Sequence, residues 1–169
     1  MKAAIVNPSL LDSFTLFPSF GSSYEVGLKI HFLKDGTVTK LGCRAGNKGT
    51  YSVSLWDYET TNLIASSNIT VTDSLQYTYK SITPVSVSLD KHYVISMNTN
   101  SGGVAKDYWI FYRKISQGTI SMNIYPFTSG NIIFEEIRSK ETNTPTFPTL
   151  VSSPWNFIAQ ADLQFEYNE

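Results

Sequence analysis

The 169-residue chain has a single cysteine, Cys43, so an intramolecular disulfide is excluded. Cys43 lies in an alternating apolar run, and we interpret it as a small buried side chain rather than a reactive thiol. Charge is also scarce, because Asp, Glu, Lys and Arg make up 16% of the residues and the formal net charge is -1. Nucleic acid and anionic membrane surfaces are therefore not expected as partners.

Long apolar runs are missing as well. No stretch approaches the length of a transmembrane helix, and the apolar residues after Lys2 are too few for the core of a secretory signal peptide. Membrane insertion is therefore not expected. The polar positions are filled mainly by Ser, Thr and Asn, as is common in secreted β-proteins. If the chain is exported, its targeting segment is absent from this sequence.

A helical period is absent too, and the chain shows a period of two instead. In residues 49–56 the side chains of Tyr51, Val53 and Leu55 are expected on one face of a strand. Trp56 is expected on the other face, and we interpret it as a packed side chain. Similar short segments recur between turn residues from one end of the chain to the other. They are 24–32, 38–44, 50–57, 63–66, 68–71, 76–82, 92–98, 108–113, 119–125, 132–137 and 161–167.

This spacing of strands and turns predicts an all-β fold, an antiparallel β-sandwich of the jelly-roll type. We expect one domain over residues 1–169, with 1–23 as an irregular N-terminal arm packed on it and a short strand near Phe14–Phe17. Pro84 is expected to end the strand that begins at Gln76, because proline lacks a backbone donor.

Catalytic motifs are not apparent. Glu135 and Glu136 are neighbours in a predicted strand, so they are expected to point to opposite faces and not to form a glycosidase pair. The serines lack a nucleophile elbow, and His31 and His92 stand in separate strands without partners. The chain is therefore not expected to be an enzyme.

Metal-binding patterns are equally sparse. No Cys or His lies at a zinc-like spacing, so neither a zinc site nor another cofactor is expected. Structural calcium stays open, because oxygen-rich loops of β-sandwiches can supply carboxylates and carbonyls. The candidate ligands are Asp35, Asp57, Glu59, Asp73 and Asp107.

Aromatic side chains, by contrast, make up 14% of the chain. Exposed Trp and Tyr can stack on the flat faces of sugar rings while their polar groups bond hydroxyls. Trp155 is the first candidate because it follows a proline in a polar loop, and Asn156 beside it could supply a hydrogen bond. Tyr58 and Tyr125 at strand ends and Trp109 in an aromatic strand are the further ligand-binding candidates.

Several short motifs follow one another in a recognisable order. They are YEVGLKIHF (24–32), GTVT (36–39), YSVSLW (51–56), LIAS (63–66), LQYTY (75–79), PVSV (84–87), YVIS (93–96), FPT (147–149) and DLQF (162–165). This series resembles the bacterial extracellular "domain of unknown function" family 4082. Leu75 stands where that family often has Trp, and Gly42-Cys43-Arg44 replaces its R-F-Y strand.

The resemblance implies a non-catalytic module of secreted or surface proteins, with an extracellular or cell-surface location, and it supplies no catalytic residues. Our leading hypothesis is that the module recognises carbohydrate through loop aromatics. The alternative is a protein-interaction or structural spacer domain, whose partner is a neighbouring surface protein. A hydrolase is the third class, and it requires a cleft with two facing carboxyls.

Overall fold

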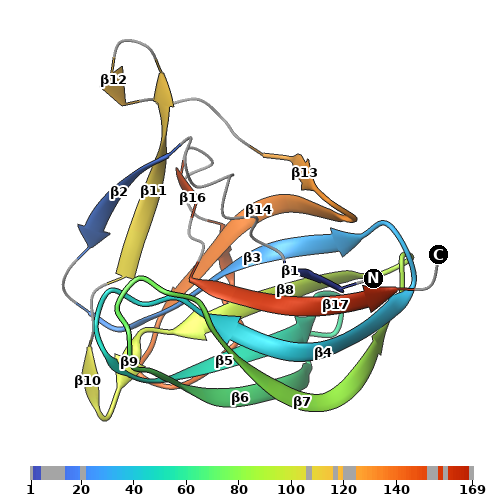
Figure 1. The fold of residues 1–169 in the computed structure, drawn as a ribbon, viewed down its shortest axis with the longest axis horizontal. Coiled ribbons are helices and arrows are strands. Elements are labelled where there is room, and N and C mark those ends of the chain that lie inside the picture. The colour runs from blue at the N-terminus through green and yellow to red at the C-terminus, as the bar shows by residue number, and fades with distance from the viewer. Residues whose placement is uncertain are drawn as a thin grey trace.

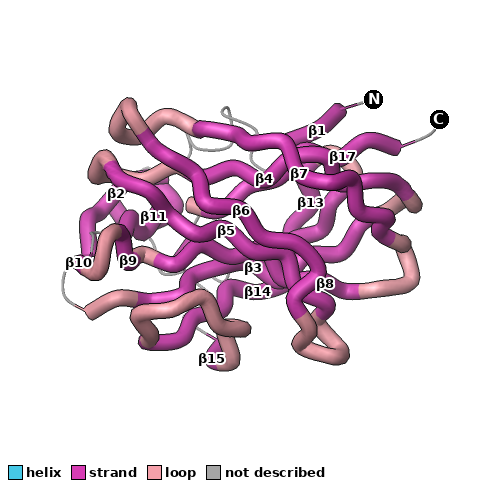
Figure 2. The backbone as a smooth tube through the Cα atoms, turned by 90° about the horizontal axis from the view of Figure 1, so that it is seen from below, coloured by secondary structure: helices cyan, strands magenta, loops and turns pink. Residues whose placement is uncertain are grey.

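The regular secondary structure in the ranges that the structure describes consists of β-strands. The computed structural model describes residues 2–4, 14–19, 22–105, 108–115, 118–119, 125–151, 156–157 and 160–167, and it describes side chains in 22–105, 125–151 and 160–167. Within these ranges there is no helix, and so no helix that is long and apolar enough to span a membrane. Figure 2 shows strands throughout, with loops at their ends.

Two antiparallel sheets pack face to face around the core (Figure 1). The smaller sheet has the order β1 (Lys2–Ala4), β17 (Ala161–Tyr167), β4 (Gly36–Cys43) and β7 (Thr78–Val87). The larger sheet has the order β13 (Phe127–Ser129), β14 (Ile132–Glu141), β3 (Tyr24–Phe32), β8 (His92–Asn98), β5 (Gly49–Asp57) and β6 (Leu63–Val71), and β15 (Leu150–Val151) pairs with β14.

The order of these strands is that of a jelly roll. If β1, β3, β4, β5, β6, β7, β8 and β17 are counted as first to eighth, the two sheets run 1-8-3-6 and 2-7-4-5. Such an order arises when a long antiparallel hairpin folds over into two sheets. The predicted antiparallel sandwich of jelly-roll type is therefore confirmed, with β14 added at the edge beside β3.

Six shorter or peripheral strands lie outside the two main sheets. In Figure 1 the ribbon of β2 and β11 stands apart from the sandwich at the upper left. Residues 14–19 thus form a strand, slightly longer than the one expected in the N-terminal arm. The six strands are β2 (Phe14–Ser19), β9 (Asn100–Ser101), β10 (Val104–Ala105), β11 (Tyr108–Ile115), β12 (Gly118–Thr119) and β16 (Asn156–Phe157).

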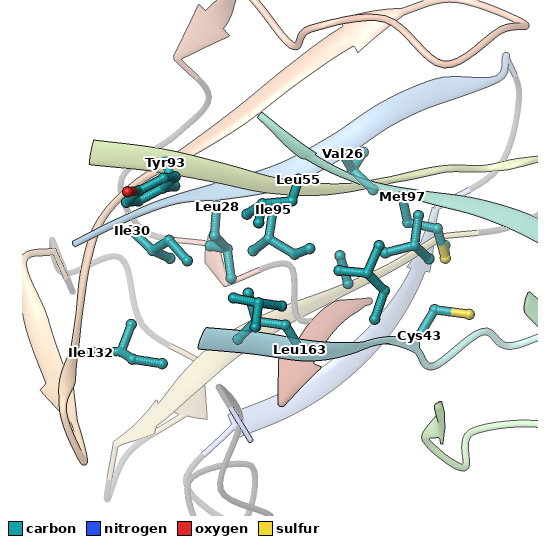
Figure 3. Close-up of a cluster of buried hydrophobic side chains, with 14 of the residues drawn as sticks. Val26, Leu28, Ile30, Cys43, Leu55, Tyr93, Ile95, Met97, Ile132 and Leu163 are labelled. Carbon is teal, nitrogen blue, oxygen red and sulfur yellow. The ribbon is translucent and has the colours of Figure 1, made fainter. Parts of the chain in front are cut away.

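The core lies between the two sheets and follows from the alternation in the sequence. In β3 the residues Val26, Leu28, Ile30 and Phe32 are buried on the inner face. In Figure 3 the side chains of Leu28, Ile95 and Leu163 meet between the sheets. Residues of one face of each strand are removed from water together, which is the main stabilisation of a sandwich.

Cys43 belongs to this core, as the sequence predicted. Its side chain is fully buried, and burial raises the pKa of its thiol to about 12. The thiolate is the reactive form of cysteine, so this side chain is a packing residue.

Two expectations about the strands are wrong. Pro84 does not end a strand, because β7 continues from Thr78 to Val87. Val85 pairs with Val38 and Ser81 with Lys40, so residues 82–84 form an irregularity opposite Thr39. Proline is tolerated here because β7 is the last strand of its sheet. The two short segments expected at 63–66 and 68–71 are one strand, β6.

Glu135 and Glu136 do not point to opposite faces. The register of β14 against β3 shifts between Phe134 and Glu136, so Glu135 is the extra residue of a β-bulge. Phe134 and Ile137 are both in the core, which leaves the two glutamates on the outer face of the larger sheet. Glu135 pairs with Lys29 and Glu136 with Arg138.

Candidate functional site

A polar groove of about 390 Å³ lies where three neighbouring strands of the larger sheet begin or end. Tyr24, the first residue of β3, pairs with Glu141, the last of β14, and Glu25 pairs with Asn98 at the end of β8. Figure 1 draws β9 and β10 at this end of the sandwich. The described lining residues are Ser22, Ser23, Asn100, Gly103, Ala105, Glu141, Thr142 and Asn143.

Hydrogen bonds hold the floor of the groove in place. The Asn100 amide donates to Ser23 Oγ at 3.1 Å, and its oxygen accepts from the Gly103 backbone at 3.0 Å. The Thr142 backbone N–H donates to the Ser23 carbonyl at 2.9 Å. These bonds fix the amide before any ligand arrives, which lowers the entropic cost of binding.

Three further side chains of the groove are available to a ligand. Ser22, Glu141 and Asn143 are exposed. In the part of the chain that the structure describes, their side chains make no hydrogen bond or ion pair. A hydroxyl, a carboxylate and an amide provide both donors and acceptors. Such a set suits a ligand that is rich in hydroxyl groups.

A second packed region lies on the outer face of the larger sheet, beneath residues 142–149. Phe147 packs edge-on against Trp56, with ring centroids 6.0 Å apart, and Val94 belongs to the same buried cluster. Arg138 holds this segment down, because its Nε donates to the Pro148 carbonyl at 2.9 Å and its Nη2 to the Thr149 carbonyl at 3.0 Å. Trp56 is therefore packed, as predicted.

A buried carboxyl group lies under the same segment. Glu25 is fully buried, and it accepts hydrogen bonds from Ser96 Oγ at 2.5 Å and Asn98 Nδ2 at 3.0 Å. Loss of hydration raises the pKa of Glu25 to about 7, although these bonds and one from the Thr146 backbone lower it. Trp56 Nε1 donates to the same Ser96 hydroxyl at 2.8 Å.

His31 and His92 have partners after all, so the expectation that they stand alone is wrong. They are direct register partners on β3 and β8, with ring centroids 4.8 Å apart. Glu135 from β14 joins them, and its Oε2 lies 2.9 Å from His92 Nδ1. Among the described residues, these three are the group whose ligand atoms could hold a metal ion.

The predicted aromatic ligand contacts are spread over different places. Tyr58 is partly buried beside His92, and Lys29 Nζ lies 4.0 Å from its ring centroid. Tyr125 is 9% exposed and belongs to the main core, so its ring packs against other residues. Neither of these two lines the groove.

The other three candidates are described in backbone only or not at all. Trp109 lies in β11, paired with Pro18, and Asn156 lies in β16, paired with Tyr112. Trp155 falls outside the described residues. The aromatic strand β11 starts three residues after Ala105 of the groove, so its first residues follow the groove closely along the chain.

Two of the carboxylates proposed for calcium, Asp35 and Asp57, accept backbone hydrogen bonds. Asp35 Oδ1 accepts from the Leu89 backbone at 2.8 Å. Asp57 Oδ1 accepts from the Thr60 backbone at 2.9 Å, and chiefly this bond lowers the pKa of Asp57. Asp107 lies outside the described residues. A calcium ion stays a prediction.

Comparison with protein families gives one match, a domain of unknown function (DUF4082), over residues 17–158. The chain belongs to this family. The predicted resemblance is thereby confirmed, and the matched range of the DUF4082 domain includes the groove, the packed outer face and the histidine pair. None of the curated proteins matches the chain.

Sequence reasoning on this DUF4082 domain missed both the groove and the histidine cluster. The groove is built from residues 22–23, 100–105 and 141–143, which are ordinary turn residues in the sequence. One signal was available: polar clusters directly before 24–32, after 92–98 and after 132–141. Their proximity follows only once β14, β3 and β8 are known to be neighbours.

Proposed function

We propose that this domain is a non-catalytic binding module of a bacterial extracellular or cell-surface protein and that it recognises carbohydrate. The observation that carries the proposal is the groove of about 390 Å³ with its amide, hydroxyl and carboxylate lining. Sugar hydroxyls donate and accept hydrogen bonds, and Asn100, Asn143, Glu141 and Ser22 offer both functions.

The position of the groove also supports the proposal. It lies at one end of a rigid sandwich, where loops carry binding residues on a fixed scaffold. The proposal differs from our sequence-based hypothesis in one respect, since the described lining is polar rather than aromatic. Trp109 and Trp155 remain the aromatic residues to test, because β11 follows Ala105 closely along the chain.

The experiment is a glycan microarray of the full chain, followed by titration calorimetry with the best saccharide. We expect Glu141→Ala combined with Asn143→Ala to weaken binding at least tenfold, as the loss of two polar contacts would. Glu59→Ala is the matched control, because Glu59 is also an exposed carboxylate. It lies far from the groove: the first residue of β5, Gly49, is beside Ser101, whereas Glu59 follows the last residue of that strand.

Other results of these binding measurements would move the site or reject carbohydrate as the ligand. Binding that survives the double substitution would remove the groove from the proposal, and its loss in Trp155→Ala or Trp109→Ala would place the site at those aromatics. A blank array with a protein shown to be folded would reject carbohydrate. The interaction or spacer function would then be favoured by Leu150 and Val151, which are 63% and 60% exposed on the edge strand β15.

A further inference from the structure

Three neighbouring strands of the larger sheet each contribute one potential metal ligand to its outer face. His31 comes from β3, His92 from β8 and Glu135 from β14, and the strand order β14-β3-β8 places them side by side. Their ligand atoms all lie within 4.8 Å of one another. Ligands of one zinc ion, each about 2.0–2.2 Å from the metal, are separated by roughly 3–3.5 Å. Small side-chain rotations would therefore close the set.

The bulge in β14 is what completes the group. A regular strand would send Glu135 or Glu136 into the core, whereas the extra residue leaves both on the outer face. Glu135 Oε2 consequently reaches His92 Nδ1 at 2.9 Å. Bulges recur beside functional sites because they redirect a side chain in this way.

A backbone carbonyl contacts one ring nitrogen of the second imidazole and so selects its tautomer. His31 Nε2 lies 2.5 Å from the Leu89 carbonyl, which can only accept, so Nε2 carries the proton. In the neutral ring the lone pair is then on Nδ1. A backbone carbonyl that fixes one ring nitrogen in this manner is the usual support of a metal-binding histidine.

We propose that His31, His92 and Glu135 bind a divalent transition-metal ion of the zinc class, with water in the remaining coordination positions. Imidazole and carboxylate together suit Zn²⁺ and Co²⁺, and two histidines with one glutamate leave a position open. The ion can enter from solvent, because the His92 and Glu135 side chains are 34% and 22% exposed.

Lys29 opposes the ion. Its Nζ lies 3.0 Å from Glu135 Oε2 and 4.0 Å from the Tyr58 ring centroid, so it neutralises the carboxylate that the metal requires. Coulomb repulsion between an ammonium group and a divalent cation at this range is unfavourable. The Lys29 charge is therefore expected to weaken Zn²⁺ binding, and its removal is expected to tighten the site.

The test is calorimetric titration of the chelator-treated full chain with Zn²⁺, with the visible absorption of Co²⁺ as a second readout. We expect one ion per chain, at least tenfold weaker binding in His31→Ala and in His92→Ala, and at least threefold tighter binding in Lys29→Met. Methionine keeps the apolar stem over Tyr58. Lys140→Met removes the same charge near the other end of β14, opposite Glu25, and should leave the affinity unchanged.

Two results would overturn the proposal. One is the absence of stoichiometric Zn²⁺ binding at millimolar concentration in both wild type and Lys29→Met. The other is wild-type affinity in both histidine variants. Should either histidine variant fail to fold by thermal melting, the Lys29→Met and Lys140→Met pair still decides, because an ion bound elsewhere would not distinguish these two lysines.

Discussion

Ser96 donates from its hydroxyl to the Glu25 carboxylate at 2.5 Å, in the middle of the larger sheet and beneath residues 142–149. The same hydroxyl accepts from Trp56 Nε1, so a buried carboxyl, a hydroxyl and an indole form one chain of bonds. Burial of a charge is costly even when it is hydrogen-bonded. The protonation of Glu25 must therefore be coupled to folding.

Stability should fall as pH rises from about 4.5 to about 7. Glu25 has a pKa of about 7 in the folded chain and an ordinary value of 4.5, so the folded state holds the proton more tightly. Its contribution is complete below about pH 4.5 and is lost as pH passes about 7, with a magnitude of up to about 3 kcal/mol. Urea denaturation at several pH values between about 5 and 8 measures this slope.

Glu25→Gln should flatten that dependence, because glutamine stays neutral over the whole interval. Glu141→Gln is the matched control, since Glu141 is an exposed carboxyl at the end of β14 and should leave the slope intact. A slope in Glu25→Gln that parallels wild type would show that another group carries the pH dependence.

Arg138 should be a principal anchor of the segment over the outer face. Its guanidinium donates to the carbonyls of Pro148 and Thr149 and pairs with Glu136 at 2.5 Å. Arg138→Ala would leave these acceptors without their charged donor and is expected to cost about 2–4 kcal/mol. Arg138→Lys should lie in between, because an ammonium donates from a single nitrogen and cannot reach all the acceptors that Nε, Nη1 and Nη2 of the planar guanidinium serve.

Urea denaturation of these variants provides the measurement, with Lys140→Ala as control. Lys140 lies two residues further along the same strand and should change the free energy of unfolding by less than about 0.5 kcal/mol. Equal effects of Arg138→Ala and Lys140→Ala would mean that the two carbonyl bonds contribute nothing.

The strands could be predicted from sequence where one face is buried. Alternation in 24–32 and 161–167 gave β3 and β17 with their observed bounds, because a one-residue slip would turn every core side chain outward. Irregularities within strands could not be predicted, because no residue type in the sequence marks the bulge at Glu135. Pro84 misled for a related reason, because its tolerance depends on the edge position of β7.

The sites could not be predicted, because they depend on which strands are neighbours. His31 and His92 lie side by side because β3 and β8, which are far apart in the sequence, are neighbouring strands of the larger sheet. The spacing rules for metal ligands apply to residues close in sequence and so do not identify this pair. The pattern of apolar residues shows which face of each strand is buried, whereas the order of strands in a sheet depends on the whole chain. Tyr125 was predicted to contact a ligand because of its position at a strand end, but it packs into the core. Its position in the sequence did not indicate this burial.

Gly27 should not tolerate a side chain. It pairs with Ser96 across β3 and β8, and a Cβ at this position would lie 2.3 Å from the Ile95 carbonyl oxygen and 2.7 Å from Ser96 Cβ. Backbone atoms must shift to relieve this contact, so Gly27→Ala is expected to cost about 1–3 kcal/mol. A thermal midpoint equal to that of wild type would show that the two strands separate freely at this point.

Cys43 should report on the opening of the core. Its thiol is fully buried between the sheets, and desolvation raises its pKa to about 12, so almost no thiolate is present at neutral pH. A disulfide reagent such as Ellman's should label the native chain no faster than the sandwich unfolds, and label it fully in denaturant. Labelling should accelerate in Gly27→Ala, because a less stable sheet opens more often. Rapid labelling of the wild-type chain in native buffer would contradict the packing described for β4 and β17.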